Sequence, residues 1–323
     1  MVNWIIISFL IVIGFFLIIF SLNNREKILI EDLQKDSEYE FFESLDGATY
    51  YTTYGSEEDC PLILIHGLSI PSFYYKETAE ALSSIGFKVH IYDHFGRGYS
   101  DRSKSDYNMS LYQRQLENFI DHLDLDKVTL MGVSMGGAIA SNYASKNKEK
   151  IETLILNVPF IGSETIGLSG FMHFPFVWDF YLRFVIIKRA ITRGAEMQDE
   201  DDSRKVNHFV QQFSIKGTEN SFNSLLKNFL AHNFLGDYKK LSVLQIPTHV
   251  TYAIDDEDVP LNDPFAGDDA SASTIISDSS VEAETRNLSK FKLVGVFISK
   301  SEQFATLVDD TGEFISLGLF EEL

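Results

Sequence analysis

Apolar and polar positions alternate along most of the chain in runs that predict strands and helices in turn. Short apolar runs such as PLILIHG and KVTLMGVS are typical of buried parallel strands. Between them, runs with apolar residues three or four positions apart predict amphipathic helices. We expect strands at residues 61–67, 88–93, 127–134, 151–159 and 248–255, and helices at 76–86, 110–125 and 136–147.

This order of elements indicates the fold class. Strands that alternate with helices of this length predict right-handed β-α-β crossovers and an α/β fold with a mainly parallel, doubly wound sheet. An antiparallel hairpin is expected first, at residues 38–55, with its turn at Asp46-Gly47. Ser110 is a plausible N-cap for the helix at 110–125. Residues 161–243 have helical spacing and predict a cap over the C-terminal edge of the sheet, where ligands bind in open α/β sheets.

The N-terminus has a different pattern. No charged residue occurs from Trp4 to Leu22, and a helix of about 20 residues spans roughly 30 Å of hydrocarbon. A retained single-pass transmembrane anchor over residues 1–22 is favoured over a cleaved signal peptide, because no basic segment precedes the run and no small-residue cleavage site follows it. The polar residues 23–37 predict a linker. Arg25 and Lys27 flank only the C-terminal side, which favours a cytoplasmic domain.

The composition changes again after Pro260. Residues 262–289 are rich in Ser, Ala and Asp and predict a linker. The tail at 290–323 predicts three strands joined by turns. The expected domains are an anchor at 1–22, a linker at 23–37, an α/β core at 38–160 and 244–261 interrupted by the cap at 161–243, an acidic linker at 262–289 and a β-rich tail at 290–323.

Charge and cysteine content narrow the range of partners. The net charge is −20, whereas binding nucleic acid needs clustered Lys and Arg. Nucleic acid is therefore not an expected partner. Cys60 is the single cysteine, which excludes an internal disulfide, and neither a pair of cysteines nor a His-x-x-x-His spacing suggests a metal site. No cofactor is expected either.

One short segment has the features of a catalytic serine. Gly132-Val133-Ser134-Met135-Gly136 lies between a predicted strand and a predicted helix and matches the G-x-S-x-G pattern. In that pattern the serine occupies a strained strand-to-helix turn, where neighbouring side chains would clash with the adjacent strand and helix. The N–H of Met135, at the start of the helix, can stabilise an oxyanion. Ser134 is therefore the candidate nucleophile.

Three motifs, in this order and spacing, resemble those of the α/β-hydrolase fold family: LIHGL at 64–68, DHFGRGYS at 93–100 and GVSMGG at 132–137. Residues 38–160 are similar to capped serine hydrolases of the monoacylglycerol-lipase-like and meta-cleavage-product types. The resemblance implies that residues 66–68 form an oxyanion loop, with the Leu68 N–H as the second donor and His66 as a structural residue. A dehalogenase is not implied, because that chemistry uses Asp at the position of Ser134.

The same resemblance implies a position for the acid of the triad. IPTHVTYAIDDEDVP, at residues 246–260, is similar to the family's strand that delivers the catalytic aspartate. The aspartate three residues before Val-Pro is Asp256, with Asp255 and Asp258 as alternatives. Ala253 stands where the family usually has glycine.

The catalytic histidine is not identified. The family's chain order is Ser, Asp, His, yet all eight histidines precede Asp256 in this sequence. A serine hydroxyl is a poor nucleophile near neutral pH without a base to take its proton. The candidates for a base recruited from elsewhere are His94 at the sheet edge and His173, His208 and His232 in the cap.

Two functions from different classes fit these observations. The first is a membrane-anchored serine hydrolase that cleaves a small lipophilic carboxylic ester, or a related acyl bond, through an acyl-enzyme on Ser134. The second is a catalytically impaired or truncated hydrolase fold that lacks the triad histidine and acts as a membrane-tethered binding module.

The tail bears on the second function. Residues 281–318 weakly resemble the small β domain of inner-membrane secretion and pilus-assembly proteins, which implies a protein partner for the tail and a periplasmic domain. Because that location conflicts with the flanking charges, the side of the membrane stays open. Alternatively, FKLVGVFIS at 291–299 supplies the last strand of the main sheet.

Overall fold

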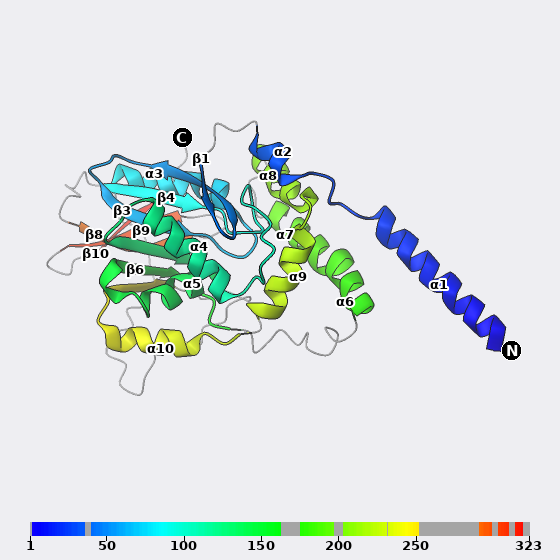
Figure 1. The fold of residues 1–323 in the computed structure, drawn as a ribbon. Coiled ribbons are helices and arrows are strands. Elements are labelled where there is room, and N and C mark those ends of the chain that lie inside the picture. Colours follow the sequence, from blue (N-terminus) through cyan, green and yellow to red (C-terminus); the bar gives the residue numbers. More distant parts are fainter. Residues whose placement is uncertain are drawn as a thin grey trace.

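The centre of the molecule is a seven-stranded sheet with the order β1-β2-β4-β3-β5-β6-β7 (Figure 1). The computed structural model describes residues 2–35, 40–162, 175–196, 203–230, 232–251, 291–298, 303–309 and 314–318. The strands of the sheet are β1 (Glu40–Ser44), β2 (Gly47–Tyr54), β3 (Cys60–Ile65), β4 (Phe87–Tyr92), β5 (Val128–Val133), β6 (Ile151–Asn157) and β7 (Thr248–Thr251).

Pairing within the sheet is mainly parallel. Parallel pairs join β4 to β3, β3 to β5, β5 to β6 and β6 to β7. Strand β2 pairs antiparallel with both β1 and β4. The predicted α/β fold with a mainly parallel sheet is therefore confirmed. The predicted hairpin is confirmed as well, with Leu45 and Asp46 between its two strands.

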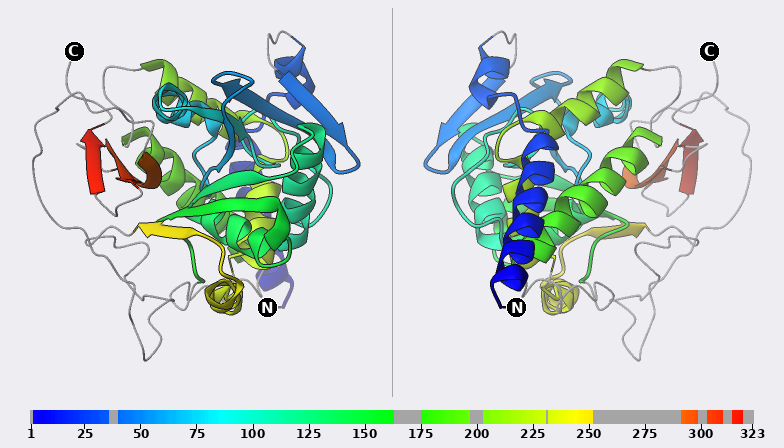
Figure 2. Two further views of the ribbon diagram at one scale, coloured as in Figure 1. Left: turned by 90° about the vertical axis from the view of Figure 1, so that its left-hand side faces the viewer. Right: turned by 90° about the vertical axis from the view of Figure 1, so that its right-hand side faces the viewer.

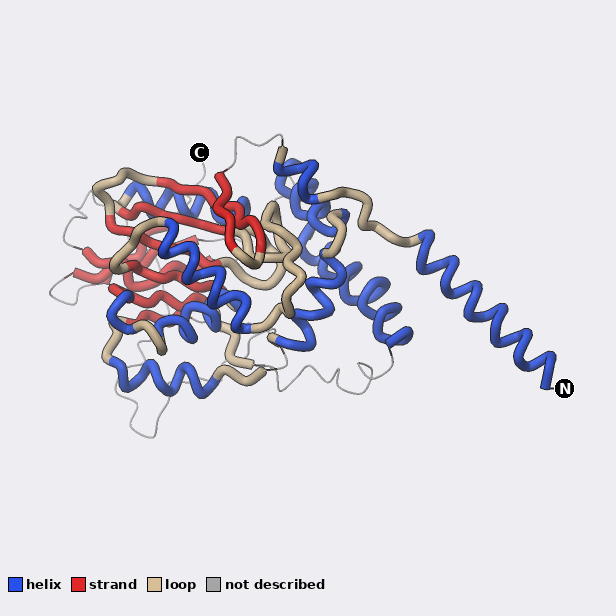
Figure 3. The backbone as a smooth tube through the Cα atoms, viewed as in Figure 1, coloured by secondary structure: helices blue, strands red, loops and turns tan. Residues whose placement is uncertain are grey.

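Helices cover both faces of the sheet (Figure 3). Ile63 and Ile65 of β3 pack in the core beneath α4 (Met109–His122) and α5 (Met135–Ala144), while Leu62 and Leu64 pack beneath α3 (Lys76–Ser84). All four side chains are fully buried. A continuous apolar run fits this strand because successive side chains enter two different cores.

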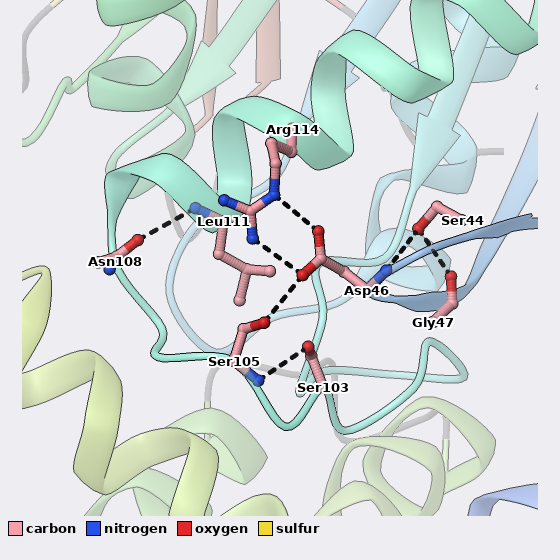
Figure 4. Close-up of polar contacts among 8 residues, drawn as sticks. All are labelled: Ser44, Asp46, Gly47, Ser103, Ser105, Asn108, Leu111 and Arg114. Carbon is pink, nitrogen blue, oxygen red and sulfur yellow. Dashed lines mark hydrogen bonds and ion pairs between the residues drawn. The ribbon is translucent and has the colours of Figure 1, made fainter.

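The start of α4 differs from the sequence-based assignment. Asn108, in extended backbone, is the N-cap, and its side-chain oxygen accepts a hydrogen bond of 3.1 Å from the Leu111 N–H (Figure 4). Ser110 lies inside the first turn, so its assignment as the cap is wrong. One turn further along, Arg114 of α4 donates to both carboxylate oxygens of Asp46, each at 2.8 Å, and so ties the hairpin turn to the helix.

The described residues between β6 and β7 form helices, as the sequence predicts. They are α6 (Pro175–Tyr181), a π-helical segment (Leu182–Ile186), α7 (Ile187–Glu196), α8 (Ser203–Gln211), the 3₁₀ turn η5 (Gln212–Ser214), α9 (Thr218–Asn228) and α10 (Leu235–Leu244). Helices α6 to α9 gather at one end of the sheet, and α10 lies beside α5 (Figure 1). Contacts from Gln212 and Ser221 to the loops after β3 and β4 show that this end is the C-terminal edge.

Residues 26–28, here called the N-terminal strap, pack against the cap. The backbone N–H groups of Lys27 and Ile28 donate to the Ser214 carbonyl at 2.8 and 2.9 Å, and the Lys216 N–H donates to the Ile28 carbonyl at 2.9 Å. A carboxylate oxygen of Glu26 accepts from the Glu219 N–H in α9 at 2.6 Å. This part of the predicted linker therefore belongs to the packed structure, and the short helix α2 (Ile30–Gln34) follows it.

The tail strands form a sheet of their own. Strands β8 (Phe291–Ile298), β9 (Gln303–Asp309) and β10 (Phe314–Gly318) pair antiparallel in the order β10-β9-β8. This sheet lies on the same side of the main sheet as α3, with β8 near β6 and β7 (Figure 2). The alternative in which residues 291–299 complete the main sheet is therefore wrong for the described residues, because β8 pairs with β9.

Helix α1 (Val2–Leu22) projects beyond the cap in Figure 1. Within the described part of the chain, no helix meets the length and apolarity needed to cross a membrane. The structure does not describe the side chains of several α1 residues. The structure does not show the predicted transmembrane anchor over residues 1–22, which stays a prediction.

Candidate active site

Ser134 lies in a strained turn between β5 and α5, with φ +52° and ψ −114°. A positive φ is uncommon outside glycine, and a strained backbone of this kind costs about 1–3 kcal/mol. Three hydrogen bonds hold the turn: the Ser134 N–H donates to the Asn157 carbonyl at 3.0 Å, and the Ser134 carbonyl accepts from Gly137 at 2.9 Å and from Phe160 at 3.0 Å. Strand β6 and helix α5 together therefore impose the strained conformation.

The glycines around Ser134 are required by close approaches of backbone. A Cβ atom on Gly132 would lie 2.4 Å from the Gly136 carbonyl oxygen, and one on Gly136 would lie 2.0 Å from the Ile65 carbonyl oxygen. A Cβ on Gly137 would lie 2.8 Å from the Cβ of Pro159. These contacts confirm the steric reason for the glycines that the sequence pattern suggests.

The loop after β3 lies against the serine. A Cβ on Gly67 would be 3.5 Å from the Cβ of Ser134, which places the loop and the serine side by side. Met135 is the first residue of α5, so its N–H has no partner within the helix. The structure thus brings Ser134, Met135 and the loop that includes Leu68 to one edge of the sheet. The roles of Leu68 and Met135 as oxyanion donors remain a prediction.

His66 supports this loop from below as a neutral ring. Its Nε2 accepts a hydrogen bond from the His94 N–H at 3.0 Å, so the proton is on Nδ1, which donates to the Gly67 carbonyl at 2.7 Å. Complete burial, and next the nearby His94, lower the pKa of His66 well below its usual value. The structural role that the resemblance implies for His66 agrees with these contacts.

His94 is unsuited to be the missing base. Its Nε2 donates to the His66 carbonyl at 2.9 Å, and its ring packs against Tyr112 at 5.1 Å. Burial lowers the pKa of His94 to about 3, whereas an effective general base has a pKa near the working pH. The structure therefore places His94 among the packing residues beneath the loop after β3.

Neither His208 nor His232, the other candidate bases in the described residues, hydrogen-bonds to Ser134. The His208 ring packs on Phe73 and Tyr99, and the exposed His232 lies near Phe234. Among the residues that the structure describes, none hydrogen-bonds to the Ser134 hydroxyl. His173 lies outside the described residues, as do Asp256 and its alternatives Asp255 and Asp258.

Strand β7 nevertheless leads toward the candidate site. Its last residue, Thr251, donates through its hydroxyl to the side-chain oxygen of Asn157 at 2.7 Å, and its carbonyl accepts from the Val158 N–H at 2.8 Å. Asn157 is the same residue whose carbonyl holds Ser134. Thr251 is the last described residue before Asp256. It therefore lies on the strand next to β6, whose last residue, Asn157, holds Ser134.

Sequence reasoning missed a second strained residue at this edge. Val158 has φ +40°, which is rare for a β-branched residue and is typical of functional sites. No sequence signal marks it, because Val158 closes an ordinary strand pattern.

The described residues contain no group of three or more His, Cys, Asp or Glu side chains that could hold a metal ion.

Comparisons with known proteins agree with this geometry. A family model described as alpha/beta hydrolase fold matches residues 61–256. Haloalkane dehalogenase 2 of Mycobacterium tuberculosis is 28% identical over 165 residues, which cover 49% of this chain and 57% of the dehalogenase. The chain thus spans little more than half the length of that relative. Proline iminopeptidase of Lactobacillus helveticus is 28% identical over 243 residues, which cover 64% of this chain and 78% of the peptidase.

Solved structures share the fold. A bromoperoxidase from Bacillus anthracis aligns with a TM-score of 0.57 and 19% identity, over 69% of this chain and 84% of its own. A carboxylesterase from Bacillus subtilis aligns with a TM-score of 0.52 and 18% identity, over 68% of this chain and 74% of its own. At such identities the likeness concerns the fold alone.

Proposed function

Because the chain belongs to the alpha/beta hydrolase fold family, we propose that it is a serine hydrolase that cleaves a lipophilic carboxylic ester through an acyl-enzyme on Ser134. The observation that carries the proposal is the strained turn of Ser134 at the N-terminus of α5, directly beside the loop after β3. A strained serine held against two candidate oxyanion donors is the arrangement that acyl transfer requires.

In the proposed reaction, the Ser134 oxygen attacks the ester carbonyl while a base removes its proton. The N–H groups of Met135 and Leu68 hold the negative oxygen of the tetrahedral intermediate. Collapse of that intermediate releases the alcohol and leaves an acyl group on Ser134, which water then hydrolyses. Asp256 is proposed to orient the base.

The substrate class rests on the surroundings of the serine. The N–H of Phe160 donates to the Ser134 carbonyl, and Leu68 follows Gly67, which lies beside Ser134. Both Phe160 and Leu68 carry partly buried apolar side chains, which favours an acyl group over a charged substrate. The matching carboxylesterase structure supports the same class by its name only. Dehalogenation is not proposed, since Ser134 stands where that chemistry uses Asp.

The experiment that tests the proposal is labelling of the purified protein with a fluorophosphonate, which reacts with activated serines. We expect the wild type to label and Ser134→Ala to remain unlabelled. Ser145→Ala, at the other end of α5, is the matched control and should label like the wild type. His173→Gln tests the one histidine outside the described residues, and loss of a triad base is expected to slow labelling by about 10⁴-fold.

Each result has a definite meaning. Labelling that persists in His173→Gln would exclude His173 as the base. Failure of a cooperatively folded wild type to label would contradict the proposed hydrolase. It would favour the second candidate, a binding module with a protein partner for the sheet β8–β10. The specific observation behind that candidate is the lack of a hydrogen-bond partner for the Ser134 hydroxyl among the described residues.

We further propose that α1 anchors the protein in a membrane, with the side of the membrane left open. Support comes from the uncharged run between Trp4 and Leu22 and from the exposure of apolar side chains along α1, including Leu10 at 60% and Ile11 at 66%. We expect the full chain to sediment with membranes and to resist extraction by carbonate. Deletion of residues 2–22 should release it, and release of the full chain by carbonate would contradict the anchor.

A further inference from the structure

The proposed oxyanion loop is held from two sides by side chains that also contact the cap. The Leu68 carbonyl accepts a hydrogen bond of 2.6 Å from Nε of Arg97, and the Ser69 carbonyl accepts one of 3.0 Å from the side-chain amide of Gln212. Both carbonyls directly follow the Leu68 N–H, the proposed oxyanion donor. Fixing two successive peptide groups restricts the direction in which that N–H points.

Gln212 is itself firmly placed. The residue is 2% exposed, and its carbonyl accepts a hydrogen bond of 2.9 Å from the Thr218 hydroxyl of α9. Two residues along, the Ser214 carbonyl accepts from both N–H groups of the strap residues Lys27 and Ile28. The N-terminal strap and α9 therefore hold η5 in position while the Gln212 side chain reaches back to the core.

Arg97 joins the same loop to α9. Its guanidinium, which is fully buried, donates from Nη1 to the Ser221 hydroxyl at 2.9 Å and lies 3.7 Å above the centre of the Phe222 ring. Burial lowers the pKa of Arg97. Burying a cation is costly unless it is hydrogen-bonded, and the hydrogen bonds of Arg97 join the loop after β3 to α9.

We propose that Gln212 and Arg97 are positioning residues. They couple the positions of the cap elements η5 and α9 to the direction of the Leu68 N–H. The inference rests on the proposed function, because it assumes that Leu68 is an oxyanion donor. Oxyanion stabilisation depends on donors that are held in place before the reaction begins. Gly67, which has no side chain to pack, makes this loop dependent on such outside support.

The test compares Gln212→Met, which keeps the size of the side chain and removes its donor, with Gln211→Met one residue earlier as the matched control. Hydrogen exchange in the full chain is measured at the backbone amides of residues 67–70 and, for reference, of β5. We expect exchange at 67–70 to accelerate about fivefold to tenfold in Gln212→Met alone, the effect of one neutral hydrogen bond. Fluorophosphonate labelling should slow by a similar factor.

Exchange does not require catalysis, so failure of this inference can be told apart from failure of the proposed hydrolase. Unchanged exchange at 67–70 would overturn the inference whether or not the wild type labels. Equal acceleration in β5 would also overturn it, because that result means general destabilisation. Faster loop exchange with unchanged labelling of an active wild type would refute the link to the oxyanion. Gln212→Asn, which keeps a buried amide but withdraws it from Ser69, replaces Gln212→Met if that variant does not fold.

Discussion

Gly136→Ala is expected to destabilise the protein by more than about 4 kcal/mol, a large share of the roughly 5–15 kcal/mol by which native proteins are typically stable. The added Cβ would lie 2.0 Å from the Ile65 carbonyl oxygen and 2.7 Å from the His66 carbonyl oxygen. Both are backbone atoms of β3 and of the loop that follows it, so no side-chain rotation can relieve the overlap. Helix α5 would have to move away from the sheet. Urea unfolding followed by circular dichroism measures the change.

Gly236→Ala is the matched control for this prediction. Gly236 lies in α10, where no atom lies within 4 Å of the added Cβ and no positive φ is required. The same substitution should stabilise the protein there by about 0.5–1 kcal/mol, because alanine restricts the unfolded chain. Equal effects of the two substitutions would contradict the steric argument for Gly136.

Glu219→Leu is expected to cost about 3–5 kcal/mol, since it removes the Glu219 carboxylate from the buried Arg183 guanidinium. The side chains of Arg183 and Glu219 are 9% and 11% exposed, and Nε of Arg183 lies 3.0 and 2.8 Å from the two oxygens of Glu219. Nη2 of Arg183 donates to the same carboxylate. This ion pair joins the π-helical segment of the cap to α9, so its loss should loosen the cap first.

A double-mutant cycle separates the ion pair from general damage. In Arg183→Met/Glu219→Leu both charges are gone, and most of the lost stability should return, because no buried guanidinium is then left lacking the Glu219 carboxylate. The exposed pair Lys127–Glu152, whose side chains are 61% and 64% exposed, is the matched control. Lys127→Met should cost less than about 1 kcal/mol. Strictly additive losses in the double mutant would refute the account of the buried pair.

The strands, the helices that follow them and the turn around Ser134 were predictable because each depends on a local pattern. A buried parallel strand needs an apolar run, a helix needs apolar residues three or four positions apart, and a strained turn needs glycine beside it. Gly132, Gly136 and Gly137 all meet backbone or side-chain atoms at distances that no larger residue tolerates. Asn108 was missed as the cap of α4 because two residues close together can both offer a side-chain oxygen.

The missing histidine separates what the sequence shows from what only the tertiary structure shows. The sequence shows that no histidine follows Asp256, but it leaves four upstream histidines as candidates for the base. Only the fold removes His94, since its burial beneath the loop after β3 depends on β3 and β4 lying side by side. His208 likewise stacks on Phe73 and meets Tyr99 edge-on, and both rings are distant in the chain.

The sequence by itself determined the α/β fold, the helical nature of the cap and the serine at the strand-to-helix turn, since periodicity and glycine placement act over a few residues. Only the tertiary structure decided what supports the loop after β3, which lies beside that turn. Gln212 and Arg97 reach the loop from distant positions, and the N-terminal strap pairs with η5 across most of the chain. Such contacts leave no local pattern, because they depend on how complete elements pack against one another.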